Sequence, residues 1–422
     1  MVWLSGRSDV AVPPTAVAPR RWRMMGLLGA GELLAMSPWF SASAVAPLIA
    51  AQWSLTGIAL PMLTIAVQLG FVVGALLLAA TGAADVLPAR SLFLAGAVVA
   101  ALANLGFAFL AGGFASAAGL RFVTGVALAG VYPVGMKMVT GWFREDRGFA
   151  IGLLVGALTV GSSLPYLFRA LGALAGLDWR VVVAGASVAG VLGGAIVGAA
   201  ARPGPFEVAA PRLSLGVARR AFAEPAVRLA NLGYLGHMWE LYAMWAWIPL
   251  FLAASFAAAG QPDPSASSLA AFLIVGAGGV GCAVAGLAAD RVGRTALTSA
   301  AMAVSGTTAV VMGLAFGAAP IVTVVIGLVW GVSVVADSAQ FSAAVTELSP
   351  PGTAGSALAL QTASGFLLTG TTITLVGVLS SGGEAGWRLA FALLAIGPAV
   401  GVVAMWRLRR RPEASLMAGG QR

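Results

Sequence analysis

The sequence predicts an all-α, polytopic membrane protein, and its composition, the length of its apolar runs and its internal repetition are the observations that predict it. Of the 422 residues, 59% are hydrophobic and only 9% are charged, whereas soluble domains carry about 25% charged residues. The apolar residues lie in runs of about twenty or more, the length that a helix needs to cross a bilayer. The runs show no alternation of period two, so the spans are helices rather than strands of a closed barrel.

Short polar breaks divide the chain into twelve predicted spans, six in each half. The first six are expected at residues 24–50, 56–81, 90–111, 115–140, 148–174 and 179–200. The second six are expected at residues 227–256, 268–289, 295–316, 320–345, 354–381 and 386–408. The predicted organisation is an N-terminal tail, a six-helix bundle, a central loop, a second six-helix bundle and a C-terminal tail, at residues 1–23, 24–200, 201–226, 227–408 and 409–422.

Landmarks recur between the two halves at a nearly constant spacing. The recurring pairs are Trp179 and Trp387, Asp85 and Asp290, and Gly148 and Gly355. Their separations are 208, 205 and 207 residues. This constancy indicates a duplicated six-helix unit, so the two bundles are expected to be pseudo-symmetric, with a binding site between them near the bilayer midplane.

Basic residues gather on one side of the predicted spans. Of the 24 arginines and lysines, 20 fall in the two tails, the central loop and the breaks after spans two, four and eight. Only Arg169, Arg180 and Arg388 lie near the other side, and Arg121 lies within a span. The positive-inside rule then predicts that both termini and the central loop are cytoplasmic. The chain is expected in the inner (plasma) membrane. Topology also accounts for the net charge of +9 without nucleic acid as a partner.

One polar break in the second half carries a motif. Residues 286–295 read Gly-Leu-Ala-Ala-Asp-Arg-Val-Gly-Arg-Thr, which resembles the G-x-x-x-D-R-x-G-R-R/K signature of the major facilitator superfamily (MFS). The matching break in the first half keeps only the aspartate and the last arginine in register. The resemblance implies the MFS fold and a gating role for these loops, with topology-setting charge as the alternative. The implied gating residues are Asp85, Arg90, Gly286, Asp290, Arg291, Gly293 and Arg294.

Span four contains a second short pattern. Arg121, Gly125 and Ala129 are spaced as in the R-x-x-x-G-x-x-x-A motif of proton-coupled members of the same family. In that family, spans one, four, seven and ten line the central cavity. The deeply placed ionisable residues of this chain fall in those spans and are Glu32, Arg121, His237, Glu240 and Asp337. Because such a residue costs at least ~2.5 kcal/mol at the centre of a membrane helix, each is a functional candidate.

The buried acids are candidate proton carriers. Glu32 and Glu240 are 208 residues apart, which matches the repeat, and they are expected to face each other across the cavity. A carboxyl group removed from water favours its neutral form, so Glu32, Glu240 and Asp337 could each carry a proton. Arg121 could stabilise a deprotonated form, and a static acid–arginine pair that pins helices is the alternative. His237 lies one turn before Glu240 and is a candidate relay or substrate contact, or a simple hydrogen-bonding neighbour.

Aromatic and amide side chains accompany these charges in the same spans. The further cavity candidates are Trp39, Tyr132, Trp247, Trp330 and Gln340. Acids combined with aromatic faces suit amphipathic or cationic organic molecules, partly through cation–π attraction. Packing within the bundle or placement at the membrane interface is the alternative for most of these rings.

The sequence therefore favours a secondary active transporter that moves a small organic solute by alternating access, coupled to protons, with drug-like efflux slightly ahead of uptake. Uptake or exchange of organic anions at Arg121 is the alternative, and a non-transporting membrane sensor on the same scaffold is the alternative from another class. No nucleotide-binding or hydrolase motif is present, so no enzyme is expected. With one histidine and one cysteine, the chain is expected to hold no metal and no cofactor. Its expected partners are a small-molecule substrate, protons and the lipid bilayer, and it is expected to act as a monomer.

Overall fold

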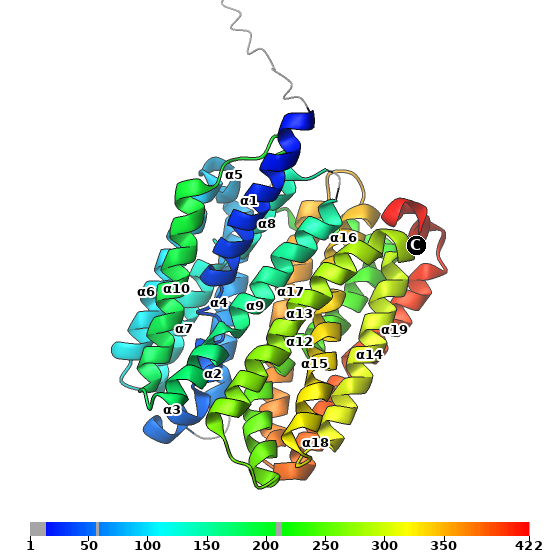
Figure 1. Cartoon of the computed structure of the whole chain (residues 1–422). Coiled ribbons are helices and arrows are strands. Elements are labelled where there is room, and N and C mark those ends of the chain that lie inside the picture. The colour runs from blue at the N-terminus through cyan, green and yellow to red at the C-terminus, as the bar shows by residue number, and fades with distance from the viewer. Residues whose placement is uncertain (1–13, 56–58, 145, 208–212, 422) are drawn as a thin grey trace, which may run out of the picture.

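The computed structural model describes residues 14–55, 59–144, 146–207 and 213–421, and they form an almost entirely helical protein (Figure 1). The helices of the first half are α1 (Pro14–Ala35), α2 (Ser41–Ala44), α3 (Ala46–Trp53), α4 (Ala59–Thr81), α5 (Ala83–Val86), α6 (Ala89–Phe109), α7 (Phe114–Leu128), α8 (Tyr132–Trp142), α9 (Arg147–Leu174) and α10 (Trp179–Ala200). After α11 (Leu215–Ala223), the second half contains α12 (Pro225–Ala258), α13 (Pro264–Val292), α14 (Arg294–Leu314), α15 (Pro320–Ala336), α16 (Ser338–Leu348), α17 (Ala354–Ser380), α18 (Gly383–Leu394) and α19 (Ile396–Arg409). Two 3-10 helices, η1 (Pro412–Leu416) and η2 (Ala418–Gly420), follow.

The predicted twelve-helix architecture in two bundles is confirmed. Among the described residues, 11 helical segments are long and apolar enough to cross a membrane, and they correspond to the predicted spans two to twelve. The first span is formed by α1, α2 and α3 together. It falls outside that set because α1 starts with a cluster of arginines and because the chain leaves the α-helix at residues 36–40.

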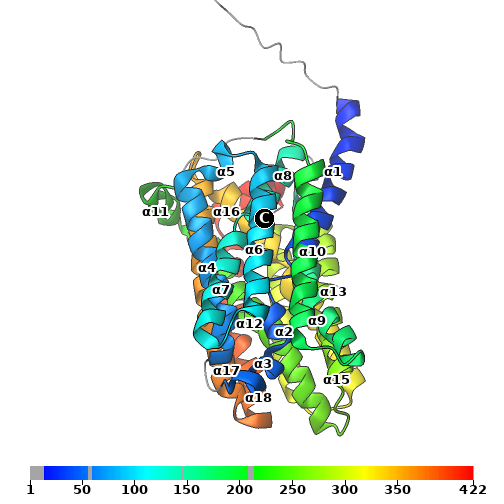
Figure 2. The ribbon, with the colours of Figure 1, turned by 90° about the vertical axis from the view of Figure 1, so that its left-hand side faces the viewer.

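The predicted tails and central loop contain more structure than expected. Helix α1 begins at Pro14 rather than at residue 24, whereas residues 1–13 of the predicted tail lie outside the described residues. The central loop contains α11, which lies outside the bundle near α4 and packs against α17 (Figure 2). The C-terminal tail folds back on the second half, because Ala414 and Met417 are fully buried. Hydropathy cannot detect such segments because they are short and amphipathic.

Four spans are interrupted, and three of them are spans that the sequence analysis assigned to the cavity. Span one breaks at residues 36–40, span four between α7 and α8, span ten at Asp337 and span twelve between α18 and α19. Pro38 and Pro133 lie in or beside two of these breaks, where proline removes a backbone donor and prevents a regular helix. Each break frees backbone carbonyls that must find partners inside the protein.

The two halves meet along two helix pairs, α9 with α13 and α4 with α17. Figure 1 shows α9 and α13 side by side along their length. Glycines permit this approach: a Cβ atom added to Gly152 would lie 2.6 Å from the carbonyl oxygen of Cys282, and one added to Gly156 would lie 2.9 Å from that of Gly279. Small residues at this spacing let helix backbones pack closely in lipid.

Candidate transport site

The break in span one is held by Arg121 of α7, whose side chain is fully buried. Its Nη1 donates to the carbonyl oxygen of Pro38 (2.9 Å), to Asn104 Oδ1 (2.7 Å) and to Ser41 Oγ (3.1 Å). Its Nη2 donates to the carbonyl oxygen of Trp39. A guanidinium group suits this place because the C-terminal end of a helix carries free carbonyls and partial negative charge. Arg121 therefore positions the segment that carries Trp39.

This placement corrects the expectation that Arg121 pairs with a buried acid. Its hydrogen-bond partners among the described residues are uncharged oxygen atoms, and Phe107 lies under the guanidinium group with its ring centroid 5.6 Å away. The sequence analysis did not single out Asn104. A polar residue within the apolar run of span three was the available signal, because a buried amide needs partners.

Glu32 lies in the interior of the first half. Its side chain is fully buried, and neither carboxyl oxygen has a hydrogen-bond partner among the described residues. The carboxyl group faces α8 at Gly135, where an added Cβ atom would lie 2.5 Å from Oε2 and 3.4 Å from the ring of Phe93. Tyr132 at the start of α8 is partly exposed and lies within electrostatic range of Glu32. Burying such a carboxyl group in its charged form is costly, because no partner replaces the lost hydration.

His237 and Asp337 form a buried pair in the second half, although they were predicted as separate candidates. Nδ1 of His237 on α12 lies 2.8 Å from Oδ1 of Asp337, with side chains only 1% and 2% exposed. The two atoms are close enough for an ion pair but are not aligned for a hydrogen bond, and Nε2 of His237 has no partner among the described residues. Asp337 sits at the break between α15 and α16, so the pair joins span seven to the interrupted span ten.

Glu240 does not face Glu32 across a cavity, contrary to the expectation from the repeat. Its Oε2 accepts a hydrogen bond from Ser305 Oγ (2.8 Å), and its Oε1 accepts one from Trp330 Nε1 (2.7 Å). These partners lie on α14 and α15, so Glu240 points into the second half while Glu32 points into the first. The repeat placed the two glutamates at related positions, but it carried no information about their partners.

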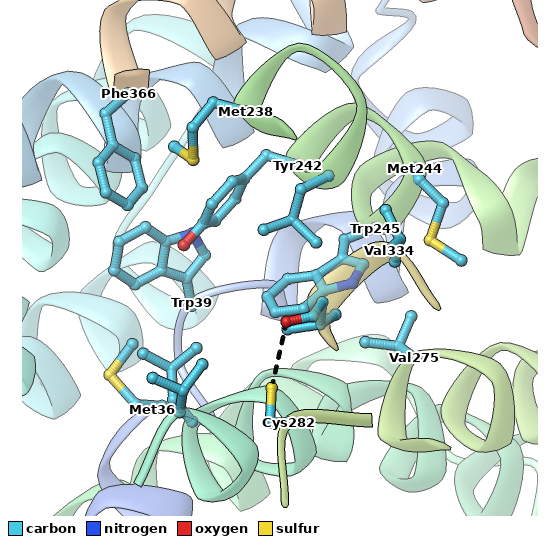
Figure 3. Close-up of a cluster of buried hydrophobic side chains, with 14 of the residues drawn as sticks. Met36, Trp39, Met238, Tyr242, Met244, Trp245, Val275, Cys282, Val334 and Phe366 are labelled. Carbon is cyan, nitrogen blue, oxygen red and sulfur yellow. Dashed lines mark hydrogen bonds between the residues drawn. The ribbon is translucent and has the colours of Figure 1, made fainter. Parts of the chain in front are cut away.

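Aromatic rings from both halves fill the middle of the molecule. Trp39 packs against Phe71, Tyr242 and Phe366, with ring centroids 5.0, 6.0 and 5.7 Å away. Figure 3 shows Trp39, Tyr242 and Phe366 grouped together, with Trp245 beyond them. We call Trp39, Phe40, Phe71, Tyr242, Trp245 and Phe366 the aromatic seam. It occupies the place where the sequence predicted an open cavity.

Hydrogen bonds between the halves accompany the aromatic seam. The Tyr166 hydroxyl of α9 donates to the carbonyl oxygen of Trp245 (2.7 Å), and Thr369 Oγ1 of α17 donates to Gln68 Oε1 of α4 (2.5 Å). Trp247 borders a cavity of only about 20 Å³ beside the seam and donates through Nε1 to a carbonyl on α17 (2.9 Å). The halves are thus closed against each other at mid-depth.

At the end of the bundle that carries the two chain termini, the predicted gating motif is centred on Arg294. Its Nε and Nη2 donate to the two carboxyl oxygens of Glu347, each at 2.7 Å, and its Nη1 donates to Gln340 Oε1 (2.7 Å). Asp290 lies 3.4 Å from Nη2. Gln340 therefore belongs to this gating cluster rather than to a cavity. The sequence analysis missed Glu347, although an acid just past the predicted end of span ten was a usable signal.

The other motif residues have distinct places. Gly293 has a φ of 93° between α13 and α14, a conformation that favours glycine. Gly286 lies against Gly148 of α9, and an added Cβ atom there would lie 3.0 Å from the Gly148 carbonyl oxygen. Arg291 is exposed and makes no ion pair with any described residue. Of the two predicted basic residues, Arg294 is the one that connects the loop to α16.

The first half has a smaller counterpart of this cluster. Asp85 Oδ1 lies 2.5 Å from Nζ of Lys137, which also donates to the carbonyl oxygen of Ala84 (2.7 Å) and lies 3.7 Å from Glu207. Lys137 comes from α8 and was counted only as a topology signal in the sequence analysis. Arg90, the other predicted residue here, is exposed at the start of α6.

This arrangement defines a class of protein. Two bundles of membrane-crossing helices, packed together over buried ionisable groups and each carrying a charged cluster at the same end, are the architecture of a multi-pass membrane transporter. The sequence profile of the Major Facilitator Superfamily matches residues 28–367, so the chain belongs to this family. It is a transporter and not an enzyme. No curated protein sequence matches the chain.

Solved structures share the fold. One is the MFS proton:xylose symporter XylE bound to 6-bromo-6-deoxy-D-glucose, which is 13% identical, with a TM-score of 0.71 over 92% of this chain and 96% of that chain. Another is a D-xylose-proton symporter, which is 15% identical, with a TM-score of 0.72 over 94% of this chain and 99% of that chain. At these identities the likeness concerns the fold.

Proposed function

We propose that this chain is a proton-coupled secondary transporter of a small organic solute, working by alternating access. The observation that carries the proposal is the burial of an unpaired Glu32 in one half and of the His237–Asp337 pair in the other. Glu32 and Asp337 are both buried, so each can bind a proton in a place that bulk water does not reach. The structural relatives named above are proton symporters of a sugar, which supports coupling to protons.

The geometry supports a simple coupling scheme. Protonation of Glu32 removes a charge that has no partner, which stabilises the closed packing of α1 on α8. Release of the proton makes that packing unfavourable, so the carboxylate favours a conformation in which water reaches it. The contact between His237 and Asp337 joins α12 to the break in span ten, so making or breaking it changes how span seven packs against span ten. Both acids therefore bias the equilibrium between conformations, as coupling requires.

Arginines and lysines gather at the end that carries the termini, which supports placing that end in the cytoplasm and the chain in the inner membrane. We propose a monomer as the working unit. We place export of drug-like compounds ahead of uptake. The organic-anion alternative loses support because the guanidinium group of Arg121 is already engaged by four oxygen atoms.

The test is proton movement in proteoliposomes, recorded with an internal pH dye while a panel of cationic, neutral and anionic solutes is added. We expect one solute class to drive proton flux, and we expect Glu32→Gln and Asp337→Asn to abolish it. Glu384→Gln is the matched control because Glu384 is exposed and paired with Arg388 at the opposite end. Solute-driven proton flux that survives both substitutions would contradict the proposed coupling.

A further inference from the structure

The acids of the transport region leave no place for an organic cation. Both oxygens of Glu240 accept hydrogen bonds from Ser305 and Trp330. Asp337 faces His237 at 2.8 Å. Glu32 is unpaired, but its carboxyl group is fully buried inside the first half, against Gly135 and Phe93.

The bases leave no place for an organic anion. Arg121 is surrounded by carbonyl, hydroxyl and amide oxygens inside the first half. Arg294 and Lys137 lie in the charged loops at one end and face Glu347 and Asp85. An organic ion in the middle of the bundle would therefore lack a counter-charge, and a buried charge without a partner is strongly unfavourable.

Uncharged hydrogen-bonding groups remain unused beside the aromatic seam. The indole Nε1 of Trp39 and the amide Nε2 of Gln68 are buried donors without a partner among the described residues. Both amide atoms of Gln361 are also unpaired, and this fully buried side chain lies one turn before Gly365, against which the Tyr234 ring packs. Buried polar groups are almost always hydrogen-bonded, so these three unpaired side chains indicate partners that come and go.

The aromatic seam must also be replaced when the halves separate. Its rings come from both bundles, with Trp39 and Phe71 on one side and Tyr242 and Phe366 on the other. Each such ring buries about 150–250 Å² of surface, so its exposure to water is unfavourable. A solute with a ring-sized apolar body can occupy the opened seam and restore those contacts.

We infer that the transported solute is an uncharged molecule that combines a ring-sized apolar body with a hydrogen-bond acceptor. The body stacks on the rings of the aromatic seam. The acceptor receives hydrogen bonds from Trp39 Nε1 and Gln68 Nε2, and Gln361 provides a further donor or acceptor. This inference rests on the proposed transport of an organic solute, but it does not depend on the coupling ion.

A matched series of three probes tests the inference: 1-naphthalenemethanol, 1-naphthylmethylamine and 1-naphthoic acid, which at pH 7 are neutral, cationic and anionic on the same ring. Binding is measured by equilibrium dialysis of the full chain in nanodiscs, with empty nanodiscs subtracted to remove partition into lipid. We expect the alcohol to bind at least tenfold more tightly than the amine or the acid. Equal or tighter binding of a charged probe, or no binding of the alcohol above empty nanodiscs, overturns the inference.

Variants locate the site. Trp39→Phe keeps the ring and removes the donor, so it should weaken binding of the alcohol about fivefold, the worth of one net hydrogen bond. Gln361→Leu should weaken it similarly and serves as the second variant if Trp39→Phe folds poorly. Trp406→Phe is the control because Trp406 is exposed on α19, far along the chain from the seam. Unchanged binding in both Trp39→Phe and Gln361→Leu overturns the placement of the site.

The same measurement separates the two proposals. Dialysis is done at one pH without a gradient, so it reports solute class and not coupling. Glu32→Gln should retain binding of the alcohol while losing solute-driven proton flux. If the wild-type chain shows no solute-driven proton flux but still prefers the alcohol, the coupling proposal is contradicted and the inferred substrate class is not.

Discussion

The carboxyl group of Glu32 lies where a side chain at residue 135 would stand, and Gly135 is what gives it room. Gly135→Ala should therefore push Glu32 from its place and destabilise the fold by about 1–3 kcal/mol, the usual cost of overpacking. Thermal unfolding of the purified chain measures this loss. Gly119→Ala on α7 is the matched control, because nothing lies within 4 Å of an added Cβ atom there. Equal melting temperatures for the two variants would show that Glu32 does not depend on Gly135.

Arg121→Met should destabilise the chain through the break in span one. The substitution leaves the carbonyl oxygens of Pro38 and Trp39 without their donor, and each unsatisfied buried group costs about 1–3 kcal/mol. Arg121→Lys should recover only part of this loss, because one ammonium group cannot reproduce the planar fork of a guanidinium group. Thermal unfolding in detergent compares them with Arg291→Met, in which an exposed arginine is lost. A loss of stability no larger than that of Arg291→Met would contradict the role given to Arg121.

The single cysteine, Cys282, is a built-in reporter of the contact between the halves. It is buried on α13, where its carbonyl oxygen lies against Gly152 of α9 and its thiol donates to the carbonyl oxygen of Val335, so a maleimide should label it slowly in the wild-type chain. Arg294→Met removes the link to Glu347 and Gln340 within the second half. Because Asp290 at the end of α13 lies against Gly148 of α9, the substitution should loosen the contact of α13 with α9 and increase the labelling rate. Arg291→Met should leave the rate unchanged. Faster labelling in Arg291→Met than in Arg294→Met would show that Arg291, and not Arg294, has the gating role.

Glu240 should behave as a structural residue and not as a proton carrier. Glu240→Gln keeps one acceptor oxygen, so solute-driven proton flux in proteoliposomes should persist. Glu240→Leu leaves Trp330 Nε1 unpaired and should cost about 1–3 kcal/mol of stability, seen as a lower melting temperature. Loss of proton flux in Glu240→Gln at normal stability would return Glu240 to the coupling mechanism.

The membrane-crossing architecture could be predicted because hydropathy reports which residues lie in the bilayer. The repeat also identified Glu32 and Glu240 as related positions. Neither hydropathy nor the repeat reports the direction in which a side chain points. The sequence analysis therefore could not tell that Glu240 accepts a hydrogen bond from Trp330 while Glu32 is unpaired. Glu32 precedes the break in span one and Glu240 lies on the unbroken α12, so both directions depend on how these helices are rotated against their neighbours.

The partners of charged residues were also beyond prediction from the sequence. Arg121 was correctly recognised as buried, but two of its four partners are backbone carbonyls freed by a break at Pro38, and hydropathy does not mark such a break. Asp337 and His237 are 100 residues apart and meet only because α12 packs against the interrupted span ten. The loop motif indicated the right region, whereas the acid that binds Arg294 lies on another span.

The glycine-lined contact of α9 with α13 has a mechanical consequence. At Gly152 and Gly156 the two helix backbones approach each other with no side chain between them. At these positions α9 and α13 can tilt over each other without first withdrawing a side chain. The α9–α13 pair can therefore serve as the pivot about which the two bundles rotate as rigid bodies while remaining in contact.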